Sequence, residues 1–326
     1  MKAVRSAVLG MAVVVVFFAV GVTWAADQPQ GDTKSGKKDI PLYDGKPGEK
    51  IGDVCVNPKD GAEMVWVPAG EFLRGSTDKE IATLLKDFSA ANDPIKKIIE
   101  AEKPQRKVYL DGYWIYRHPV TVAQYRKFCE ATGRDMPEAP SWGWKDNHPM
   151  VMVNWQDATD YAKWAEVSLP TEAQWEKAAR GTDGRKYPWG NEWDASKCAN
   201  SGMGVYPTAV VEKKLESTQP VGSYPAGASP YGCMDMAGNV CQWCADWYDP
   251  KYYKKAPARN PTGPSKPVKF ELLPGLMPGW TVDGGRVLRG DSWDIGNYGS
   301  FRCANRSRSV PSNRFDYCGF RCARTP

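Results

Sequence analysis

Nine cysteines are the side chains of this 326-residue sequence with the widest range of chemistry. A thiolate is a nucleophile, a ligand for soft metals and a partner in disulfides. Cys241 and Cys244 form a C-x-x-C motif, which is also typical of a structural disulfide or of two buried thiols. A zinc site needs a second pair of ligands, but His118 and His148 are the only histidines of the chain. The histidine count excludes a multi-histidine iron centre and argues against zinc.

The N-terminal residues predict export. Basic residues precede an apolar run from Val8 to Val22, and Thr23-Trp24-Ala25 places small residues around a cleavage point, so residues 1–25 are typical of a signal peptide. The run is short for a membrane anchor and no comparable stretch follows, so we expect no membrane span after cleavage. The expected location is the periplasm, the cell surface or the medium into which the protein is secreted. An odd number of cysteines in an exported chain predicts disulfides with at least one thiol left over.

Composition limits the class of protein. Residues 26–58 are polar, aperiodic and rich in Gly, Pro and Lys, which predicts a flexible leader before a folded domain at 59–326. The net charge of +5 is small and the basic residues are dispersed, so neither nucleic acid nor a lipid surface is an expected partner. The 14 Trp, 15 Tyr, 26 Pro and 31 Gly predict irregular loops held by aromatic anchors.

A few short strands and one insertion are expected in the first third of the domain. Alternation of apolar and polar residues over 64–75 predicts a strand pair, and residues 107–116 predict a further strand. Apolar residues at helical spacing over about 76–103 predict a helical insertion. We expect this insertion to be a surface helix that packs by one face.

Three core helices are predicted from capping signals. Thr121 and Thr171 each precede a glutamine by three residues, which is the spacing of a capping box, and Asn154 offers a similar acceptor. Large aromatic residues at helical spacing follow each start and are expected to face the core. After Gly181, which ends the third helix, loops are expected to dominate and to carry function.

Eight segments, in order along the chain, carry a family resemblance. They are Met64-Val-Trp-Val-Pro-Ala-Gly-Glu-Phe, Pro119-Val-Thr-Val-Ala-Gln-Tyr, Pro149-Met-Val-Met-Val-Asn-Trp, Leu169-Pro-Thr-Glu-Ala-Gln-Trp-Glu, Tyr187-Pro-Trp-Gly-Asn, Asp235-Met-Ala-Gly-Asn-Val, Arg289-Gly-Asp-Ser-Trp and Gly319-Phe-Arg-Cys-Ala. Together they resemble the formylglycine-generating enzyme family, also called the sulfatase-modifying factor family, over about residues 61–324. The resemblance implies one α+β domain with the formylglycine-generating enzyme-like variant of the C-type lectin fold, loop-rich with few short strands and about three core helices.

The resemblance also implies what chemistry is missing. The oxidases of the family look like they depend on two cysteines between a Gly-Gly-Ser and an Arg-Cys-Ala motif, where thiolates bind copper(I) and meet the substrate thiol. Here the interval Trp293–Phe301 contains no cysteine, and the preceding motif is Gly290-Asp291-Ser292. No residue is therefore assigned as catalytic, and copper is not an expected cofactor.

Disulfide positions implied by the resemblance are altered in this chain. Cys303 and Cys322 match such positions, but their partners there are replaced by Ala162 and Ala178. The two sulfurs need new partners, which are each other or Cys318 as a competitor. The disulfide candidates are Cys303, Cys318, Cys322, Cys241 and Cys244.

Calcium is the cofactor that the resemblance keeps open. The loops of the family look like they wrap Ca²⁺ through an asparagine after a glycine and a nearby acidic residue. This chain keeps Asn239 but has Gln242 in the acidic place, which weakens a site for a hard cation. Asn200 belongs to a second, earlier site. Both asparagines are also typical of turns with a left-handed backbone.

The C-terminal residues have an unusual composition. From Asp294 to Pro326 there is no Lys, Glu, Gln, Met or Trp. This gap and the Arg-Cys-Ala-Asn-Arg pattern resemble the variable proteins of diversity-generating retroelements, in which adenine-directed mutagenesis of Asn codons cannot produce those five residue types. The resemblance implies diversified positions between fixed ones, the latter being Arg302, Ala304, Arg306, Pro311, Arg314, Gly319, Phe320 and Arg321. The alternative is an ordinary loop with a biased composition.

Mixed Tyr, Ser, Asn, Arg and Asp on a rigid frame predict a recognition surface. The residues expected to bind a ligand are Trp293, Asp294, Ile295, Asn297, Tyr298, Arg306, Ser307, Arg308, Ser309, Asn313, Phe315, Asp316 and Tyr317. The leading hypothesis is an exported, non-oxidase protein that binds a protein or cell-surface ligand through these loops. One alternative is a formylglycine-generating oxidase that acts on a sulfatase cysteine through Cys241 with Cys244 or Cys318 with Cys322. Another is a scaffold subunit of a cell-envelope complex, bound through the insertion.

Overall fold

The computed structural model describes residues 40–87, 93–202, 215–271 and 281–326. The predicted signal peptide and the first part of the predicted leader lie outside these residues. Residues 40–58, by contrast, belong to the folded domain, because the Tyr43 amide donates to the Val56 carbonyl at 2.9 Å and β1 (Val54–Val56) pairs with β2 (Glu63–Val67). The expected domain start at residue 59 is therefore too late, since backbone pairing orders a segment whose composition alone suggests disorder.

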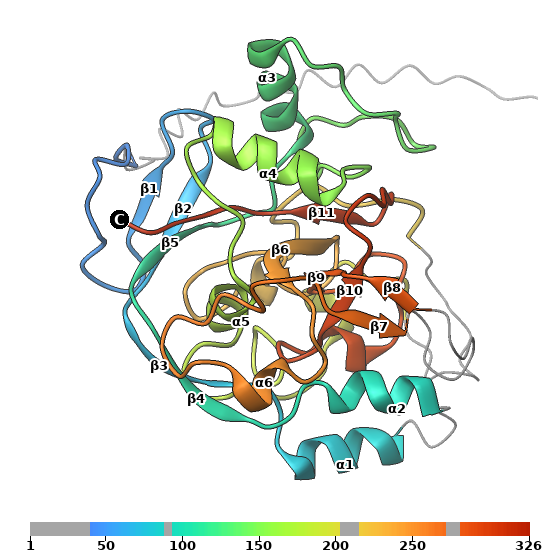
Figure 1. Ribbon diagram of the computed structural model, residues 1–326. Coiled ribbons are helices and arrows are strands. Elements are labelled where there is room, and N and C mark those ends of the chain that lie inside the picture. The colour runs from blue at the N-terminus through green and yellow to red at the C-terminus, as the bar shows by residue number, and fades with distance from the viewer. Residues whose placement is uncertain (1–39, 88–92, 203–214, 272–280) are drawn as a thin grey trace, which may run out of the picture. The chain divides into compact units, whose positions relative to one another are not determined.

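The domain contains two four-stranded sheets, one at its left edge in Figure 1 and the other near its centre. The first has the order β1, β2, β5 (Tyr113–Tyr116) and β12 (Ala323–Arg324). The second has the order β10 (Ser307–Ser309), β9 (Arg286–Arg289), β6 (Cys241–Trp247) and β11 (Cys318–Phe320). Strands β6 and β11 are parallel, whereas the other neighbours are antiparallel. The last residues of the chain therefore complete both sheets.

The predicted strands form, but with other partners. The segment 64–75 contains β2 and β3 (Gly70–Arg74), which pair with β5 and with β4 (Arg106–Leu110) rather than with each other. The predicted strand 107–116 divides at Asp111-Gly112 into β4 and β5 of different sheets. A Cβ on Gly112 would lie 2.5 Å from the Trp66 ring, so this corner requires glycine. Strands β3 and β4 form a two-stranded sheet, and β7 (Lys269–Glu271) and β8 (Thr281–Asp283) form another.

The three core helices are confirmed as α3 (Val122–Thr132), α4 (Trp155–Trp164) and α5 (Glu172–Arg180). Each begins at a complete capping box, in which the side chain of Thr121, Asn154 or Thr171 accepts from the amide three residues on. Helix α5 ends at Gly181, as expected. The buried faces carry large aromatic residues such as Tyr125, Tyr161 and Trp175 into the core.

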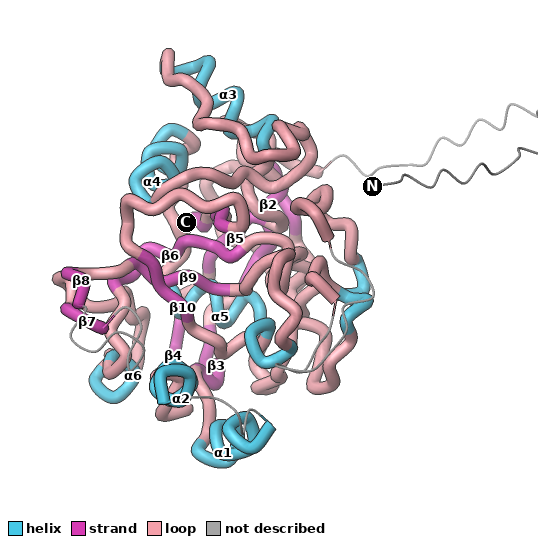
Figure 2. The backbone as a smooth tube through the Cα atoms, turned by 90° about the vertical axis from the view of Figure 1, so that its right-hand side faces the viewer, coloured by secondary structure: helices cyan, strands magenta, loops and turns pink. Residues whose placement is uncertain are grey.

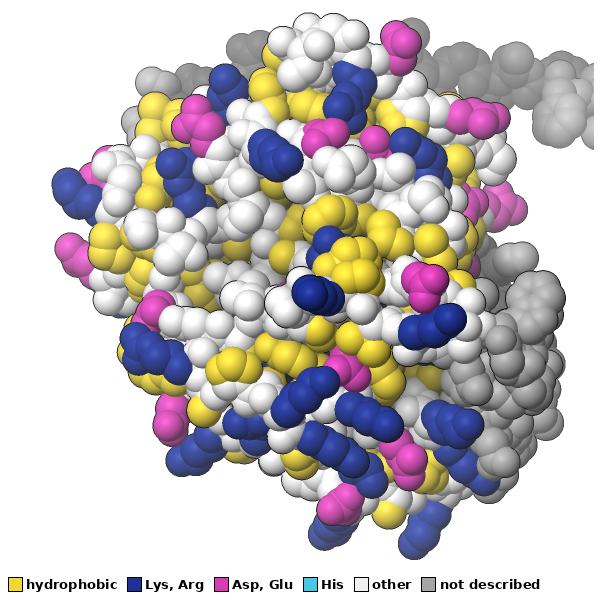
Figure 3. All heavy atoms as spheres, in the orientation of Figure 1, with side chains coloured by type: hydrophobic (Ala, Val, Ile, Leu, Met, Phe, Trp, Pro, Cys, Tyr) yellow, Lys and Arg dark blue, Asp and Glu magenta, His cyan; other side chains and the backbone are white. Residues whose placement is uncertain are grey.

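The predicted insertion is confirmed as helical and consists of α1 (Asp78–Asp87) and α2 (Asp93–Glu100). One face packs, because Ile81, Leu84 and Ile99 are buried together. Both views place α1 and α2 at the opposite end of the domain from α3 and α4 (Figures 1 and 2). Lys and Arg side chains gather over this end, where α6 (Tyr252–Lys255) also lies (Figure 3). None of the described helices is long and apolar enough to cross a bilayer.

Candidate functional site

A buried set of charges fixes the C-terminal loops on helix α5. Glu172 and Glu176 lie one turn apart on α5, and both side chains are buried. Glu172 accepts from Arg306 Nε at 2.6 Å and from Arg74 at 2.8 Å, and Glu176 accepts from Arg289 at 2.8 Å. Burial alone would raise the pKa of Glu172, but the guanidinium groups outweigh it and lower the pKa to about 2. We call this set the buried ionic cluster: Arg74, Glu172, Glu176, Arg180, Arg289 and Arg306.

Arg306 is part of this cluster, so its side chain is buried in the core and not on the surface where it was expected to meet a ligand. Its side chain is fully buried between Glu172 and the Ala101 carbonyl, to which it donates at 2.9 Å. Other expected fixed positions behave in the same way. Arg302 donates to both carboxylate oxygens of Glu102 at 2.7 Å and so ties the C-terminal loop to the insertion. Arg321 is also fully buried and donates to Gln242 Oε1 at 2.6 Å.

Eight of the residues expected to bind a ligand line one cavity of about 410 Å³. They come from the loop after β9, from β10 and from the loop before β11, and the Phe315 and Tyr317 rings stack with centroids 4.8 Å apart. A rigid aromatic pair beside adaptable polar groups is typical of a recognition surface. We call this cavity the recognition cavity, and its eight expected residues are Asp294, Ile295, Ser307, Arg308, Ser309, Asn313, Phe315 and Tyr317.

Besides Arg306, four expected residues do not line the recognition cavity. Trp293 is buried, donates from Nε1 to the Asp316 carbonyl at 3.3 Å and packs edge-on against Trp142, so it anchors the loop. The Asn297 side chain accepts from the Gly299 amide at 2.9 Å and caps a 3-10 turn, Tyr298–Phe301. Tyr298 lines another cavity, described below, and Asp316 lines neither.

Asp291 is a residue of the recognition cavity that the sequence analysis did not select. Burial raises the pKa of Asp291 to about 6, and the nearby Asp294 carboxylate adds to the effect. Ser292 joins the two acids, because its hydroxyl donates to Asp294 Oδ1 at 2.6 Å. Asp291 has φ of 54°, a left-handed backbone that favours glycine. The sequence did contain a signal for this residue, because Asp291 stands where the family motif has glycine.

The cysteines are arranged differently from what was expected. All nine are buried free thiols, so no disulfide joins the candidates, and disulfide formation stays a prediction. Cys241 and Cys244 belong to different core clusters, as do Cys322 and Cys303. Cys318 instead lies directly opposite Cys241 in the parallel register of β11 and β6, so the two cysteines are neighbours on adjacent strands. Burial and the neighbouring Cys318 raise the pKa of Cys241 well above its usual value.

The two asparagines expected to hold calcium are engaged in turns. Asn239 has φ of 64°, accepts from the Gln219 amide at 2.9 Å and donates to its carbonyl at 3.0 Å. Asn200 donates to the Cys198 carbonyl and accepts from the Gly202 amide. Gln242, in the acidic place, accepts from Trp175 Nε1 at 2.8 Å. Within the described ranges no three His, Cys, Asp or Glu side chains gather as metal ligands. Both asparagines therefore have a turn role, and calcium binding stays a prediction.

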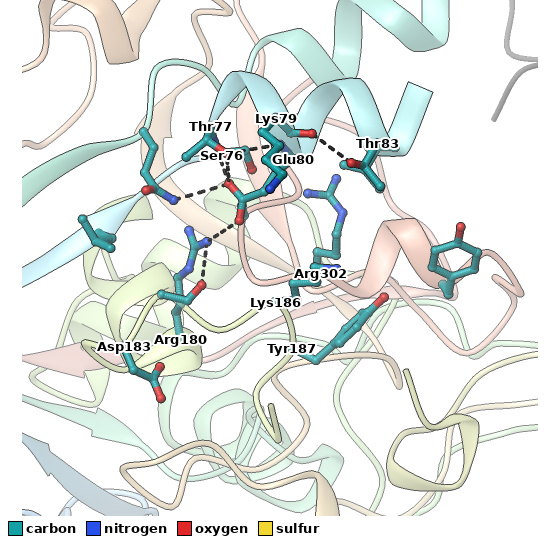
Figure 4. Close-up of a pocket in the computed structure, with 16 residues that line it drawn as sticks. Ser76, Thr77, Lys79, Glu80, Thr83, Arg180, Asp183, Lys186, Tyr187 and Arg302 are labelled. Carbon is teal, nitrogen blue, oxygen red and sulfur yellow. Dashed lines mark hydrogen bonds and ion pairs between the residues drawn. The ribbon is translucent and has the colours of Figure 1, made fainter. Parts of the chain in front are cut away.

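A second cavity of about 460 Å³ lies between α1 and the core (Figure 4). Glu80 points toward Arg180, with a closest N–O distance of 4.0 Å, and also accepts from the Thr77 hydroxyl at 2.8 Å. Arg180 donates further to the Gly75 carbonyl at 2.6 Å. The central charges of this cavity are thus paired with one another, which suits a structural junction between the insertion and the domain.

Comparison with known proteins agrees with this geometry. Residues 50–326 match the family described as the sulfatase-modifying factor enzyme 1-like domain. The chain is 40% identical over 319 residues to the formylglycine-generating enzyme of Streptomyces coelicolor, which covers 82% of this chain and 91% of that protein. It is also similar to two solved structures.

One is the structure of PvdO from Pseudomonas aeruginosa, with a TM-score of 0.62 and 26% identity over 85% of this chain and 99% of that one. The other is Treponema denticola variable protein 1, with a TM-score of 0.56 and 20% identity over 85% and 98% of the two chains, which is a likeness of fold. The expected α+β fold is confirmed. The chain belongs to the formylglycine-generating enzyme family, that of the sulfatase-modifying factor enzyme 1-like domain.

Proposed function

We propose that this protein is an exported, non-oxidase member of the family that binds a protein or another ligand through the recognition cavity. The proposal rests on the fact that residues selected from the sequence come together in the structure. Eight side chains selected by residue type, from three segments of the chain, line one cavity of about 410 Å³. Pockets of this size with a few convergent polar groups are typical ligand sites.

The division between buried and accessible residues supports the same function. Arg302, Arg306 and Arg321, which were expected to be fixed, are buried and hold the loops in place. Ser307 and Asp294, which were expected to bind a ligand, are exposed, whereas Ser309 of the same set is buried and the expected fixed residue Arg314 is exposed. A rigid frame that presents changeable side chains binds with little loss of conformational entropy.

The recognition cavity also differs from an oxidase site at the decisive position. Ile295, in the interval where the family's oxidases have their cysteine pair, lines the cavity wall and supplies no thiol. The adjacent acids Asp291 and Asp294 are hard oxygen donors, which do not suit copper(I). The wall is therefore better suited to hydrogen bonding with a ligand than to oxidation of a thiol.

The test is a screen for binders that depend on the cavity. The full-length protein would be screened against a displayed peptide library and a glycan array, beside the variants Asn313→Ala and Asn147→Ala. Asn147 is an exposed asparagine outside the cavity and is the matched control. We expect binders that lose about tenfold in affinity with Asn313→Ala and keep it with Asn147→Ala. Binders that are insensitive to Asn313→Ala and also to Tyr317→Ala would contradict the proposal.

The pairing of Cys241 with Cys318 on adjacent strands favours a second function, a thiol oxidase with relocated cysteines. Cys241 lines the recognition cavity, and Cys318 lies opposite Cys241 on the neighbouring strand. Two neighbouring thiols are a donor set that fits copper(I), which would supply redox chemistry when bound. This pair replaces the expected pair of Cys241 with Cys244. The raised pKa of Cys241 opposes the proposal, because the thiolate is the ligand.

A copper(I) titration of the reduced protein separates these two functions. It would be run beside Cys241→Ser, Cys318→Ser and, as a control, Cys129→Ser on helix α3. One-to-one binding lost in the first two variants, with an aldehyde formed on a cysteine-containing peptide, would establish the oxidase. Binding that is absent, or that survives both substitutions, leaves ligand recognition as the function of the cavity.

The scaffold alternative places a partner on the insertion. The ion pair of Glu102 with Arg302 joins the insertion to the loop beside the recognition cavity. Deletion of residues 76–103 would therefore disturb both regions. Substitutions of exposed residues on α1, such as Lys79→Ala, test the scaffold function without breaking that pair.

A further inference from the structure

A basic cavity of about 620 Å³ lies between α2, α6, β7 and β10. One acidic residue, Glu100, belongs to its lining. Four separate parts of the chain supply the basic side chains (Figure 3). The basic residues are dispersed in the sequence, and only the fold brings them together. The six basic residues of this basic cavity are Lys97, Lys103, Lys251, Lys254, Lys269 and Arg308.

The wall of the basic cavity is rigid. Tyr248 and Phe270 are buried and pack edge-on, and the Arg308 guanidinium lies 5.2 and 5.3 Å from their ring centroids. Burial lowers the pKa of Arg308, an effect that Tyr248 opposes and the charge of Arg306 reinforces. A ligand would therefore meet a positive charge whose position is already fixed.

Two lysines of the basic cavity have exposed carboxylates as partners. Lys103 lies 3.2 Å from Asp78, and Lys269 lies 3.9 Å from Asp283. The side chains of both aspartates are more than four-fifths exposed, at 92% and 85%. Ion pairs of this kind contribute little and exchange readily for a better partner. A concave site with one sign of charge raises the local concentration of ligands of the opposite sign.

We propose that the basic cavity binds a compact polyanion with at least two phosphate or sulfate groups. Its volume suits a ligand of disaccharide size, and ammonium groups act as point charges toward tetrahedral anions. Lysine heads on flexible stems reach several oxygens of such a group from different sides. This inference goes beyond the proposed function, because the basic cavity shares only Arg308 with the recognition cavity.

Calorimetric titration of the full-length protein with inorganic tripolyphosphate and with sucrose octasulfate tests this proposal. The first variant combines Lys251→Gln with Lys254→Gln, on and just before α6. The matched control combines Lys255→Gln with Lys266→Gln and has the same net charge. Lys255 pairs with Asp249 at 2.9 Å, and neither control residue lines the basic cavity. Thermal melting verifies that both variants are folded.

We expect one-to-one binding of at least one probe at about 50 mM salt, weakened about tenfold or more by the first variant and less than about twofold by the control. The probe that binds more tightly identifies phosphate or sulfate as the recognised group. Absence of binding for both probes, or equal losses in the two variants, would overturn the proposal. The variant Asn313→Ala leaves the basic cavity intact, so failure here is distinguishable from failure of the recognition cavity.

Discussion

The buried ionic cluster and the basic cavity both concentrate positive charge, but with different side chains. The cations of the buried ionic cluster are all arginines, whereas five of the six in the basic cavity are lysines. A guanidinium has five donors in one plane, and the two terminal nitrogens of Arg289 donate to two glutamates and two backbone carbonyls. An ammonium is compact and strongly hydrated, so it remains at the surface of an open cavity. The comparison separates the charges that hold the fold from the charges that a partner can use.

The largest expected effect on stability comes from a substitution in the buried ionic cluster. Glu172→Gln removes a carboxylate that three arginines share, and of the three only Arg289 keeps another carboxylate partner among the described residues, Glu176. We expect a loss of about 3–5 kcal/mol in the free energy of unfolding, measured in urea. Glu71→Gln is the control, because Glu71 is exposed and lies 3.4 Å from Lys107, and its loss should stay within about 0.5 kcal/mol. Equal losses in the two variants would mean that the buried ionic cluster does not brace the fold.

A smaller effect is expected where the buried charges meet the insertion. Glu102→Gln keeps the shape of the side chain but removes the charge that binds both guanidinium nitrogens of Arg302. We expect a loss of about 2–3 kcal/mol in the free energy of unfolding. Hydrogen exchange should speed up in α1, α2 and the turn Tyr298–Phe301 together. Faster exchange in the helices alone would show that Arg302 does not couple the two regions.

Asp246 is a buried acid beside the buried ionic cluster, so the stability of this region is expected to depend on pH. Burial and the neighbouring Glu172 raise the pKa of Asp246 to about 7 from an ordinary value of 3.8. The protonated form favours folding, so this contribution to stability is complete below about pH 4 and is lost as the pH rises to about 7. Asp246→Asn cannot ionise and still accepts from the Glu172 amide.

We therefore expect Asp246→Asn to raise the Tm relative to the original chain by a few degrees more at about pH 8 than at about pH 5. Thermal melting at the two pH values is the measurement. A difference that does not change with pH would mean that Asp246 is ionised in the folded protein throughout this range.

Salt is expected to have the smallest effect on stability and a clear effect on binding. Raising the salt from about 50 mM to about 500 mM shortens the screening length to a few ångström and weakens charge attraction in an open cavity. Binding of tripolyphosphate should weaken at least about tenfold, while the Tm should change by less than about 2 °C because buried pairs are screened little. Parallel loss of binding and Tm would show that the cluster is open to solvent.

The sequence predicted the helices well because their signals are local. Capping boxes at Thr121, Asn154 and Thr171 lie within one turn of the helices that they start. Strand pairing was predicted less well, because β2 pairs with β5 and β3 with β4, at separations of about 30 to 50 residues, rather than with each other. No local pattern specifies that choice.

The candidate site shows the same limit. Residue types alone selected eight residues that line the recognition cavity, but they did not separate the buried Arg306 from the cavity residue Arg308 two positions later. Residue types also gave no sign of the basic cavity, since Lys97 and Lys269 come together only through the fold. Contacts across long stretches of chain decide which side of an element a charge faces.

The ion pair of Glu102 with Arg302 spans 200 positions, and Arg306 reaches Ala101 across 205. Such contacts form only after nearly the whole chain has been synthesised and has collapsed. Topologies rich in contacts of this kind fold slowly, because closing long loops costs entropy before the contacts form. The insertion is synthesised well before Arg302, which lies 200 positions after Glu102. A ribosome-bound fragment that ends before Arg302 therefore retains the helices of the insertion without the brace that holds them on the domain.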